Sequence, residues 1–207
     1  MKGTSIFDER AGSWDTAPRM SLAKAVFEAI HERTGINSSM RVLDFGAGTG
    51  LLSVAASVYA GEVTAMDTSG EMLSVLDVKL KDRGIRNVTT LYCDLLTDEH
   101  RPGYYDLIIS SMTLHHVKDV PALFNRFYQV IKKGGIFAVA DLDKEDGMFH
   151  SDNNGVHHHG FTRETLVEAA EAAGFRNIRH EIIHSMEKKR NDGSHAEYRI
   201  FLLRGEK

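Results

Sequence analysis

The segment from Val42 to Gly50 contains residue types suited to binding a compact polar ligand. It reads Val-Leu-Asp-Phe-Gly-Ala-Gly-Thr-Gly, and its glycines at alternate positions lie where a short apolar run gives way to an Ala-, Val- and Leu-rich run. Glycine adopts positive φ and lets the backbone approach a ligand, while the first turn of a helix offers unpaired N–H groups. The segment predicts a strand, a glycine turn and a helix that bind something compact and polar.

The spacing of these glycines speaks against a nicotinamide dinucleotide. A dinucleotide-binding fingerprint would place its third glycine at position 51, which is Leu51, whereas this chain has it at Gly50.

Carboxylates accompany the glycine turn. Asp44 lies in the strand before the turn, Asp67 ends the next predicted strand, and Asp94 follows the third. Open α/β sheets bind ligands at the carboxyl ends of their strands, where an acid after the second strand often holds ribose hydroxyls. One ligand can therefore touch all three acids. The structural alternative is that Asp44 pairs with backbone N–H groups and that Asp67 helps to cap the helix at Thr68.

The elements that position these residues alternate between strands and helices. Apolar runs predict strands at 41–45, 62–67, 88–92, 105–110 and 135–141, and helical spacing or capping residues predict helices at 21–34, 51–59, 68–83, 121–131 and 163–173. A capping box that begins at Thr68 and an N-cap at Asp119 mark two of the helix starts. Such alternation is typical of a mostly parallel sheet with helices on both faces.

The end of the chain breaks this alternation. The strand-like runs 177–188 and 197–203 are separated by the turn-rich sequence Asn191-Asp192-Gly193-Ser194. A parallel crossover needs a dozen or more residues, so these runs predict an antiparallel hairpin. The expected fold is therefore an α/β Rossmann-like three-layer sandwich with a mostly parallel, seven-stranded sheet and an antiparallel last strand.

This combination resembles the class I S-adenosylmethionine-dependent methyltransferases that act on small molecules. The resemblance runs from about Phe7 to Leu203 and rests on the glycine turn, the acid after the second strand, Cys93-Asp94-Leu95 and the closing hairpin. It implies S-adenosylmethionine as cofactor and S-adenosylhomocysteine as product. It also implies that the glycine turn holds the amino-acid part of the cofactor, Asp67 the ribose and Asp94 the adenine. The cofactor-binding residues expected from it are Trp14, Asp44, Gly46, Ala47, Gly48, Gly50, Asp67, Thr68, Met72, Asp94, Leu95 and Ser110.

The residues after the fourth strand bear on the methyl acceptor. Methyl transfer from a sulfonium is an in-line displacement, and a base is needed only if the acceptor enters protonated. The run from Ser110 to His116 lacks the Asn/Asp-Pro-Pro-aromatic sequence of many enzymes that methylate exocyclic nitrogen. We therefore expect an oxygen, carbon or sulfur acceptor. The Leu-His-His ending resembles small-molecule methyltransferases, including those of quinone biosynthesis, and makes His115 or His116 the candidate base; for either one, capping a turn or packing on a helix is the alternative.

Two further segments are expected to border the site. The loop 142–161 is rich in acids and histidines, but it lacks the usual metal-ligand spacings, so we expect a solvated or substrate-facing loop near the acceptor and no metal. The N-terminal helical segment 1–36 contains Phe7-Asp8-Glu9-Arg10 and Trp14-Asp15, which resemble the part of the family that folds over the cofactor. Trp14 either covers the sulfonium or adenine or simply packs a helix.

Composition limits the remaining possibilities. The 207 residues carry a net charge of −4 and a lone cysteine, Cys93, with 42% hydrophobic and 26% charged residues. These features predict one domain over 1–207 in the cytoplasm, with a small-molecule acceptor as partner, no nucleic acid and no membrane span. The oligomeric state stays open.

Two other functions compete with methyl transfer. One is a non-catalytic S-adenosylmethionine-binding or accessory protein. The other is an NAD-dependent oxidoreductase, which the position of Gly50 and the terminal hairpin oppose.

Overall fold

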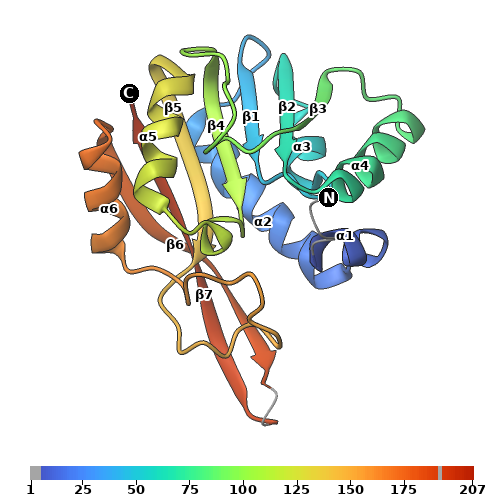
Figure 1. Ribbon diagram of the computed structural model, residues 1–207, viewed down its shortest axis with the longest axis vertical. Helices are drawn as coiled ribbons and strands as arrows, with labels where there is room; N and C mark the ends of the chain where they lie inside the picture. Colours follow the sequence, from blue (N-terminus) through green and yellow to red (C-terminus); the bar gives the residue numbers. More distant parts are fainter. Residues whose placement is uncertain (1–5, 191–192) are drawn as a thin grey trace.

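A computed structural model describes residues 6–190 and 193–207 and shows a sheet between two layers of helices (Figure 1). The sheet has seven strands in the order β3-β2-β1-β4-β5-β7-β6. Its first five strands run parallel, and β7 lies antiparallel between β5 and β6. This arrangement confirms the expected fold class. The strands are β1 (Arg41–Phe45), β2 (Glu62–Asp67), β3 (Val88–Tyr92), β4 (Tyr105–Ser111), β5 (Ile131–Leu142), β6 (Arg176–Lys189) and β7 (His195–Glu206).

The helices divide the core into two hydrophobic clusters, one on each face of the sheet. Helices α2, α3 and α4 pack on one face, and α5 and α6 pack on the other. Strand β4 serves both clusters, because Leu107 and Ile109 face the first and Ile108 faces the second. Burial on both faces explains why this strand is continuously apolar. The helices are α1 (Ile6–Arg10), α2 (Ala17–Thr34), α3 (Leu51–Ala56), α4 (Gly70–Asp82), α5 (Val120–Val130) and α6 (Arg163–Ala172), with short 3₁₀ turns η1 (Ala11–Ser13) and η2 (Leu114–His116).

Helix starts follow the capping residues, with two corrections to the expected boundaries. Helix α4 is capped by Ser69, whose hydroxyl accepts the N–H of Met72 at 3.2 Å, so the capping box expected at Thr68 is wrong. Helix α2 begins four positions before Ser21, because Pro18 lies in its first turn, where no N–H is required. Asp119 caps α5 as predicted, accepting the N–H of Ala122.

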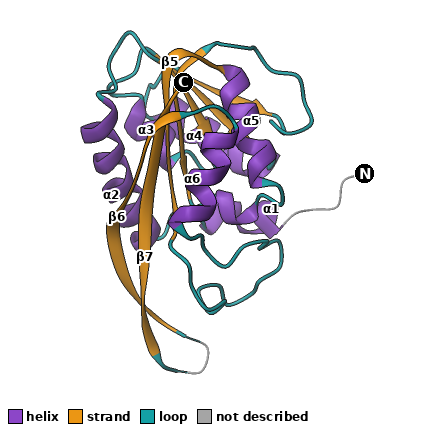
Figure 2. Cartoon of the chain, turned by 90° about the vertical axis from the view of Figure 1, so that its left-hand side faces the viewer, coloured by secondary structure: helices purple, strands orange, loops and turns teal. Residues whose placement is uncertain are grey.

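The terminal hairpin extends beyond the sheet (Figures 1 and 2). Strands β6 and β7 stay paired from Arg176 opposite Glu206 to Lys189 opposite His195. The predicted turn residues Asn191 and Asp192 lie outside the described residues. Both strands run past the sheet, so the hairpin offers side chains well beyond the carboxyl end of β5.

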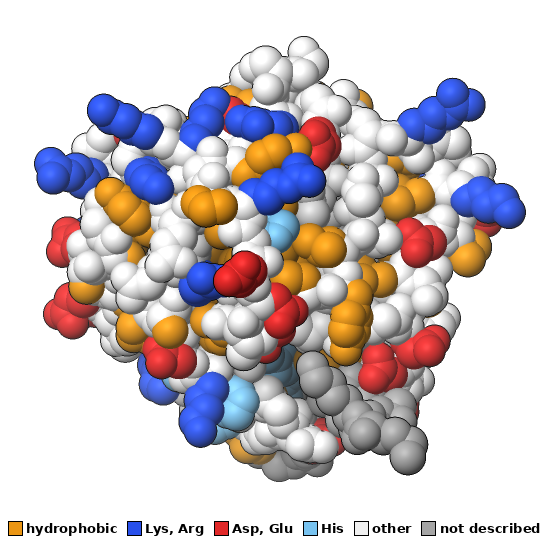
Figure 3. All heavy atoms as spheres, turned by 45° about the horizontal axis from the view of Figure 1, so that its top comes forward, with side chains coloured by type: hydrophobic (Ala, Val, Ile, Leu, Met, Phe, Trp, Pro, Cys, Tyr) orange, Lys and Arg blue, Asp and Glu red, His pale blue; other side chains and the backbone are white. Residues whose placement is uncertain are grey.

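The carboxyl ends of the parallel strands face the N-terminal segment and the loop 142–161 (Figure 1). The loop carries no helix, and its ends are joined by an isolated bridge between Asp143 and Phe161. The opposite end of the molecule, which Figure 3 brings forward, mixes basic, acidic and hydrophobic side chains. Among the described helices, none combines the length and the apolar character that a bilayer span requires.

Candidate active site

The glycine turn is shaped by packing at two of its glycines and is open at the third. Gly46, Gly48 and Gly50 have φ of 69°, 54° and 78°. A Cβ atom at Gly46 or Gly50 would lie 2.2 Å from a neighbouring side chain, whereas at Gly48 the nearest atom would be the Met72 sulfur at 4.0 Å. Packing therefore requires glycine at positions 46 and 50. Gly48 leaves space for a ligand to approach the backbone.

Asp67 ties this turn to the start of α4. One oxygen of its carboxylate accepts the N–H of Gly48 at 2.7 Å, and the other accepts the N–H of Ser69 at 2.8 Å. Burial raises the pKa of Asp67 above its ordinary value, although these N–H groups act against the shift. The neighbouring Thr68 is exposed, while Met72 is buried beneath the turn.

Asp44 lies deeper than the other acids. Its side chain is 1% exposed and accepts a hydrogen bond from the Ser53 hydroxyl at 2.6 Å. Burial raises the pKa of Asp44 to about 7, and the charge of nearby Asp67 contributes to the shift. This carboxyl group therefore changes its protonation state near neutral pH.

The sheet order brings the acidic residues to one edge. Asp44 and Asp67 lie at the ends of β1 and β2, and Asp94 follows β3 by two residues, on three neighbouring strands. Asp94 is partly buried and accepts the N–H of Leu96 at 3.0 Å. The three acids therefore lie at the same edge of the sheet, at the carboxyl ends of neighbouring strands.

Two of the expected cofactor residues use their side chains elsewhere. The Leu95 side chain is fully buried in the cluster beneath α5 and α6. The Ser110 hydroxyl is also fully buried and donates to the Phe45 carbonyl at 2.7 Å, which joins β4 to β1. The side chains of these two residues therefore serve the fold and do not reach a ligand.

The N-terminal segment is fastened to the glycine turn by polar contacts. Asp15 accepts hydrogen bonds from the Thr49 hydroxyl at 2.5 Å and the Lys79 ammonium at 2.7 Å. Asp8 accepts a hydrogen bond from the Ser69 hydroxyl at 2.5 Å. The segment thus contacts both the glycine turn and the first residues of α4. The sequence pattern did not indicate Lys79, whose partner lies 64 positions away.

Trp14 contacts the aromatic residues of this segment. Its ring lies 5.9 Å from the Phe7 ring, and the Arg19 guanidinium sits 3.9 Å from the Trp14 ring centroid. Phe7 in turn meets the His116 ring edge-on at 5.0 Å. The N-terminal segment therefore reaches the histidines that follow β4.

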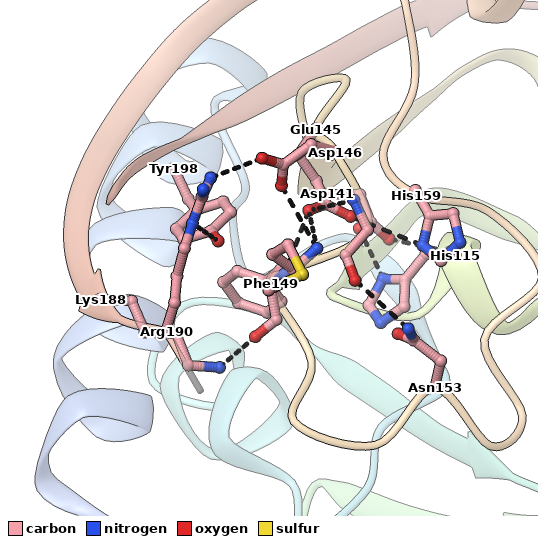
Figure 4. Close-up of polar contacts among 12 residues, drawn as sticks. His115, Asp141, Glu145, Asp146, Phe149, Asn153, His159, Lys188, Arg190 and Tyr198 are labelled. Carbon is pink, nitrogen blue, oxygen red and sulfur yellow. Dashed lines mark hydrogen bonds and ion pairs between the residues drawn. The ribbon is translucent and has the colours of Figure 1, made fainter. Parts of the chain in front are cut away.

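His115 pairs with a buried acid that the sequence analysis missed (Figure 4). Nδ1 of His115 lies 2.6 Å from Asp141, which also accepts the N–H groups of His115 and Leu142. Burial alone would raise the pKa of Asp141, but His115 and these N–H groups hold it below its ordinary value. Nδ1 of His115 therefore donates its hydrogen to the ionised Asp141, and in the neutral form of the ring Nε2 carries the lone pair. That Nε2 atom is buried without a partner among the described residues. The sequence offered one sign of this pairing, because Asp141 is an acid within the apolar run that ends the fifth strand.

Two more imidazoles surround His115. The rings of His116 and His150 lie 4.0 and 4.9 Å from the His115 ring. Nδ1 of His116 is 2.7 Å from the carbonyl of Gly155. Burial, followed by the charge of His115, lowers the pKa of His116 and of His150 to about 4, so both rings are neutral at pH 7.

The loop 142–161 packs directly against these histidines. The N–H groups of His157 and His158 donate to the His115 carbonyl at 2.9 and 3.2 Å, and the His158 ring is bonded to the Val117 carbonyl. Across residues 6–190 and 193–207, no group of three or more His, Cys, Asp or Glu side chains is arranged to hold a metal ion.

Comparison with known proteins decides the family. A family model described as a methyltransferase domain matches residues 19–180, which include the glycine turn, His115 and Asp141. The chain belongs to the class I S-adenosylmethionine-dependent methyltransferases. This family uses S-adenosylmethionine as its methyl donor, and the match sets aside an NAD-dependent oxidoreductase.

Relatives and solved structures agree with this assignment. The methyltransferase is 32% identical over 155 residues to an uncharacterised methyltransferase of Schizosaccharomyces pombe, covering 68% of this chain and 55% of that protein. It is also 32% identical over 117 residues to a ubiquinone/menaquinone biosynthesis C-methyltransferase of Shewanella oneidensis, covering 55% of this chain and 47% of that one. Its fold matches phosphoethanolamine N-methyltransferase 2 of Haemonchus contortus in complex with S-adenosyl-L-methionine, with a TM-score of 0.73, 20% identity, and coverage of 100% of this chain and 61% of that chain. The chain spans about half the length of the curated relatives it matches.

Proposed function

We propose that this methyltransferase transfers a methyl group from S-adenosylmethionine to a small-molecule acceptor that reacts through oxygen, carbon or sulfur, with His115 as the base. The observation that carries the proposal is the contact between Nδ1 of His115 and the carboxylate of Asp141, which are 2.6 Å apart. The Nε2 atom of His115 has no hydrogen-bond partner among the described residues. An acceptor of this class enters with a proton that a base removes. A base oriented by a buried carboxylate suits that step.

The described residues fit the methyl donor. The backbone at Gly48 is open to a ligand, and a side chain at this position would occupy that space. Asp67 lies beside Gly48, at the position that suits a ribose. When bound, the donor supplies an electrophilic methyl group on a sulfonium. The residues proposed to hold it are Asp44, Gly46, Ala47, Gly48, Gly50, Asp67, Thr68, Met72 and Asp94, with the main chain of Leu95 and Ser110, and with Trp14 in the segment 1–36 that covers the site. The loop 142–161 borders the acceptor within the single domain 1–207.

The chain's own part in the reaction is alignment and proton removal. The proton of the reacting O–H, S–H or C–H bond would move to Nε2 of His115, which leaves an electron pair on the acceptor atom. The bound donor would supply the methyl group to that electron pair and would keep the electrons of its own broken bond. Asp141 stabilises the imidazolium that results, because its charge lies 2.6 Å from Nδ1. His116 is a weaker base, since its pKa is lowered to about 4.

The test is methyl transfer from S-adenosylmethionine carrying a tritiated methyl group. Calorimetric titration first measures binding of the donor and of S-adenosylhomocysteine. The labelled donor is then offered to phenols, thiols, 1,3-dicarbonyl compounds and amines. We expect label in the first three classes and a large loss of it in Asp141→Asn. Label in amines alone would contradict the proposal. Tight donor binding without product from any class would favour the non-catalytic alternative.

A further inference from the structure

The turn 94–98, which follows β3 and presents Asp94, is closed by hydrogen bonds between its two ends. The Asp94 carbonyl accepts the N–H groups of Thr97 and Asp98 at 3.1 and 2.8 Å. The Asp98 carboxylate in turn accepts the N–H of Asp94 at 2.9 Å. One carboxylate oxygen of Asp94 accepts the N–H of Leu96 at 3.0 Å, and the other has no hydrogen bond to a described residue. The conformation of the turn therefore sets the position of the Asp94 carboxylate and leaves its second oxygen available to a ligand.

Arg126 of helix α5 is bonded to this turn at two points. Its Nε atom donates to the Leu95 carbonyl at 2.7 Å, and its Nη2 atom donates to the Asp98 carbonyl. The third nitrogen, Nη1, donates to the Gln129 side chain at 2.9 Å within the same helix. Arg126 is partly buried, and each of its three guanidinium nitrogens is bonded within the protein. The side chain therefore holds the main chain of the turn against α5.

The other contacts of the turn lie near its start. The N–H of Cys93 donates to the Asp67 carbonyl at 3.1 Å, which ties the end of β3 to the end of β2. The Leu95 side chain is fully buried in the cluster beneath α5 and α6, whereas Asp98 is exposed. Sheet pairing and packing therefore anchor the first half of the turn, and Arg126 extends that anchorage to Asp98.

A guanidinium is well suited to this bridging contact. Its N–H groups lie in a rigid planar fork, so one side chain bonds two carbonyls at fixed relative positions. A lysine ammonium is a single charge on a flexible stem and does not reproduce that fork. Hydrogen bonds from a charged donor are also stronger than those from a neutral one. Two such bonds restrict the movement of the turn more than packing of Leu95 alone.

We infer that Arg126 is a positioning residue for recognition of the adenine of the donor. It holds the turn 94–98 so that the second carboxylate oxygen of Asp94 accepts the amino group of the base. This inference rests on the proposed function, which places Asp94 among the residues that hold the donor. Arg126 acts through Asp94, because its own nitrogens are bonded to the turn and to Gln129. Its effect is on the choice of base and not on the transfer of the methyl group.

The experiment compares two ligands by calorimetric titration of the whole chain. One is S-adenosylhomocysteine, and the other is S-inosylhomocysteine, in which a carbonyl oxygen replaces the amino group of adenine. A carboxylate that accepts the amino group is left facing this oxygen, so we expect the inosyl compound to bind at least about tenfold more weakly to the unaltered protein. In Arg126→Met the difference between the two ligands should fall to within about threefold.

The ratio of the two affinities separates positioning from a general loss of structure. A loosened fold weakens both ligands together and leaves the ratio unchanged, whereas a misplaced Asp94 lowers the ratio. Arg86→Met is the matched control, because Arg86 is an exposed arginine before β3, and it should leave both affinities unchanged. Arg126→Lys is the second variant if Arg126→Met does not fold. Its ammonium does not bridge both carbonyls, so the ratio should fall at least about threefold below that of the unaltered protein.

The outcomes distinguish this inference from the proposed function. Failure of S-adenosylhomocysteine to bind would contradict the proposed function, and the inference with it. Binding of both ligands with equal affinity to the unaltered protein would refute the assignment of Asp94 to adenine, on which the inference depends. An undiminished preference for adenine in folded Arg126→Met or Arg126→Lys would overturn the inference alone.

Discussion

The proposed donor side and the proposed acceptor side of the candidate site are built in different ways. On the donor side, the glycine turn, Asp67 and Met72 come from one stretch of about thirty residues, and backbone N–H groups make the key contacts. On the proposed acceptor side, His115, Asp141 and His150 come from three separate segments and meet through side chains. A donor common to a family is met by a local motif, whereas the acceptor surroundings are assembled by tertiary packing.

The two sides also differ in charge. The donor side gathers carboxylates, which suit a cationic sulfonium. The proposed acceptor side gathers the imidazoles of His115, His116 and His150, which suit an acceptor that enters with a proton. Four substitutions, three of them with a matched comparison variant, test how the two sides differ.

The largest effect is expected at the acceptor side, from His115→Gln. Loss of the base should lower the turnover number by about 10²- to 10⁴-fold. The dissociation constant of S-adenosylmethionine should stay unchanged, because His115 lies outside the donor residues. The rate of label transfer and a calorimetric titration measure the two quantities. His116→Gln is the matched control and should cost less. Equal losses of turnover in the two variants would contradict the role of His115 as the base. Weaker donor binding in His115→Gln would show that His115 also contributes to the donor side.

The two sides should also differ in their tolerance of an added methyl group. Gly50 has φ of 78° and a Cβ there would lie 2.2 Å from Leu76, whereas Gly147 in the acceptor loop has φ of 85° and its nearest neighbour would be 3.5 Å away. Gly50→Ala combines left-handed strain with overpacking and should lower the free energy of unfolding by about 2–5 kcal/mol. Gly147→Ala introduces only the left-handed strain and should lower the free energy of unfolding by about 1–2 kcal/mol. Urea unfolding measures both, and equal losses would show that the donor turn is no more tightly packed than the loop.

Asp67→Ala tests the donor side directly. Removal of a charge-assisted hydrogen bond to the ribose costs about 1.5–3 kcal/mol, so the dissociation constant of S-adenosylmethionine should rise roughly 10- to 150-fold. Asp77→Ala is the control, since that exposed acid bonds only Thr90 among the described residues. Calorimetric titration of both variants with S-adenosylmethionine measures the effect. An unchanged dissociation constant in Asp67→Ala would refute the ribose assignment.

The smallest effect is the pH dependence that Asp44 imparts. Its pKa of about 7 means that a cationic donor displaces a proton at lower pH. The affinity for S-adenosylmethionine should therefore rise by up to about tenfold from pH 6 to pH 8, and Asp44→Asn should flatten this rise. Without the donor, the Asp44 carboxyl of the folded chain keeps its proton up to a higher pH than the same group in the unfolded chain. The contribution of Asp44 to stability is thus present below about pH 4 and lost as the pH rises through about 7. A slope that persists in Asp44→Asn would assign the titration to another group.

Most helices and strands could be predicted from the sequence, because they depend on local chemistry. Periodic apolar runs and glycine turns placed the strands and helices of the sandwich, and the short hairpin connection indicated the antiparallel last strand. The glycine turn and the acids at 44, 67 and 94 were found the same way, because each lies at a strand end whose position follows from neighbouring residues. A helix boundary differed from the prediction where the neighbouring residue was the cap, as at Ser69 instead of the predicted Thr68.

The tertiary structure alone decided which side chains meet. The pairing of His115 with Asp141 and the burial of Leu95 and Ser110 depend on residues of different elements. No local pattern encodes such contacts, because they depend on strand order, on the length of the hairpin and on the path of the loop 142–161. Hydrophobic periodicity reports which face of an element is buried, but it does not report which partner lies across from it.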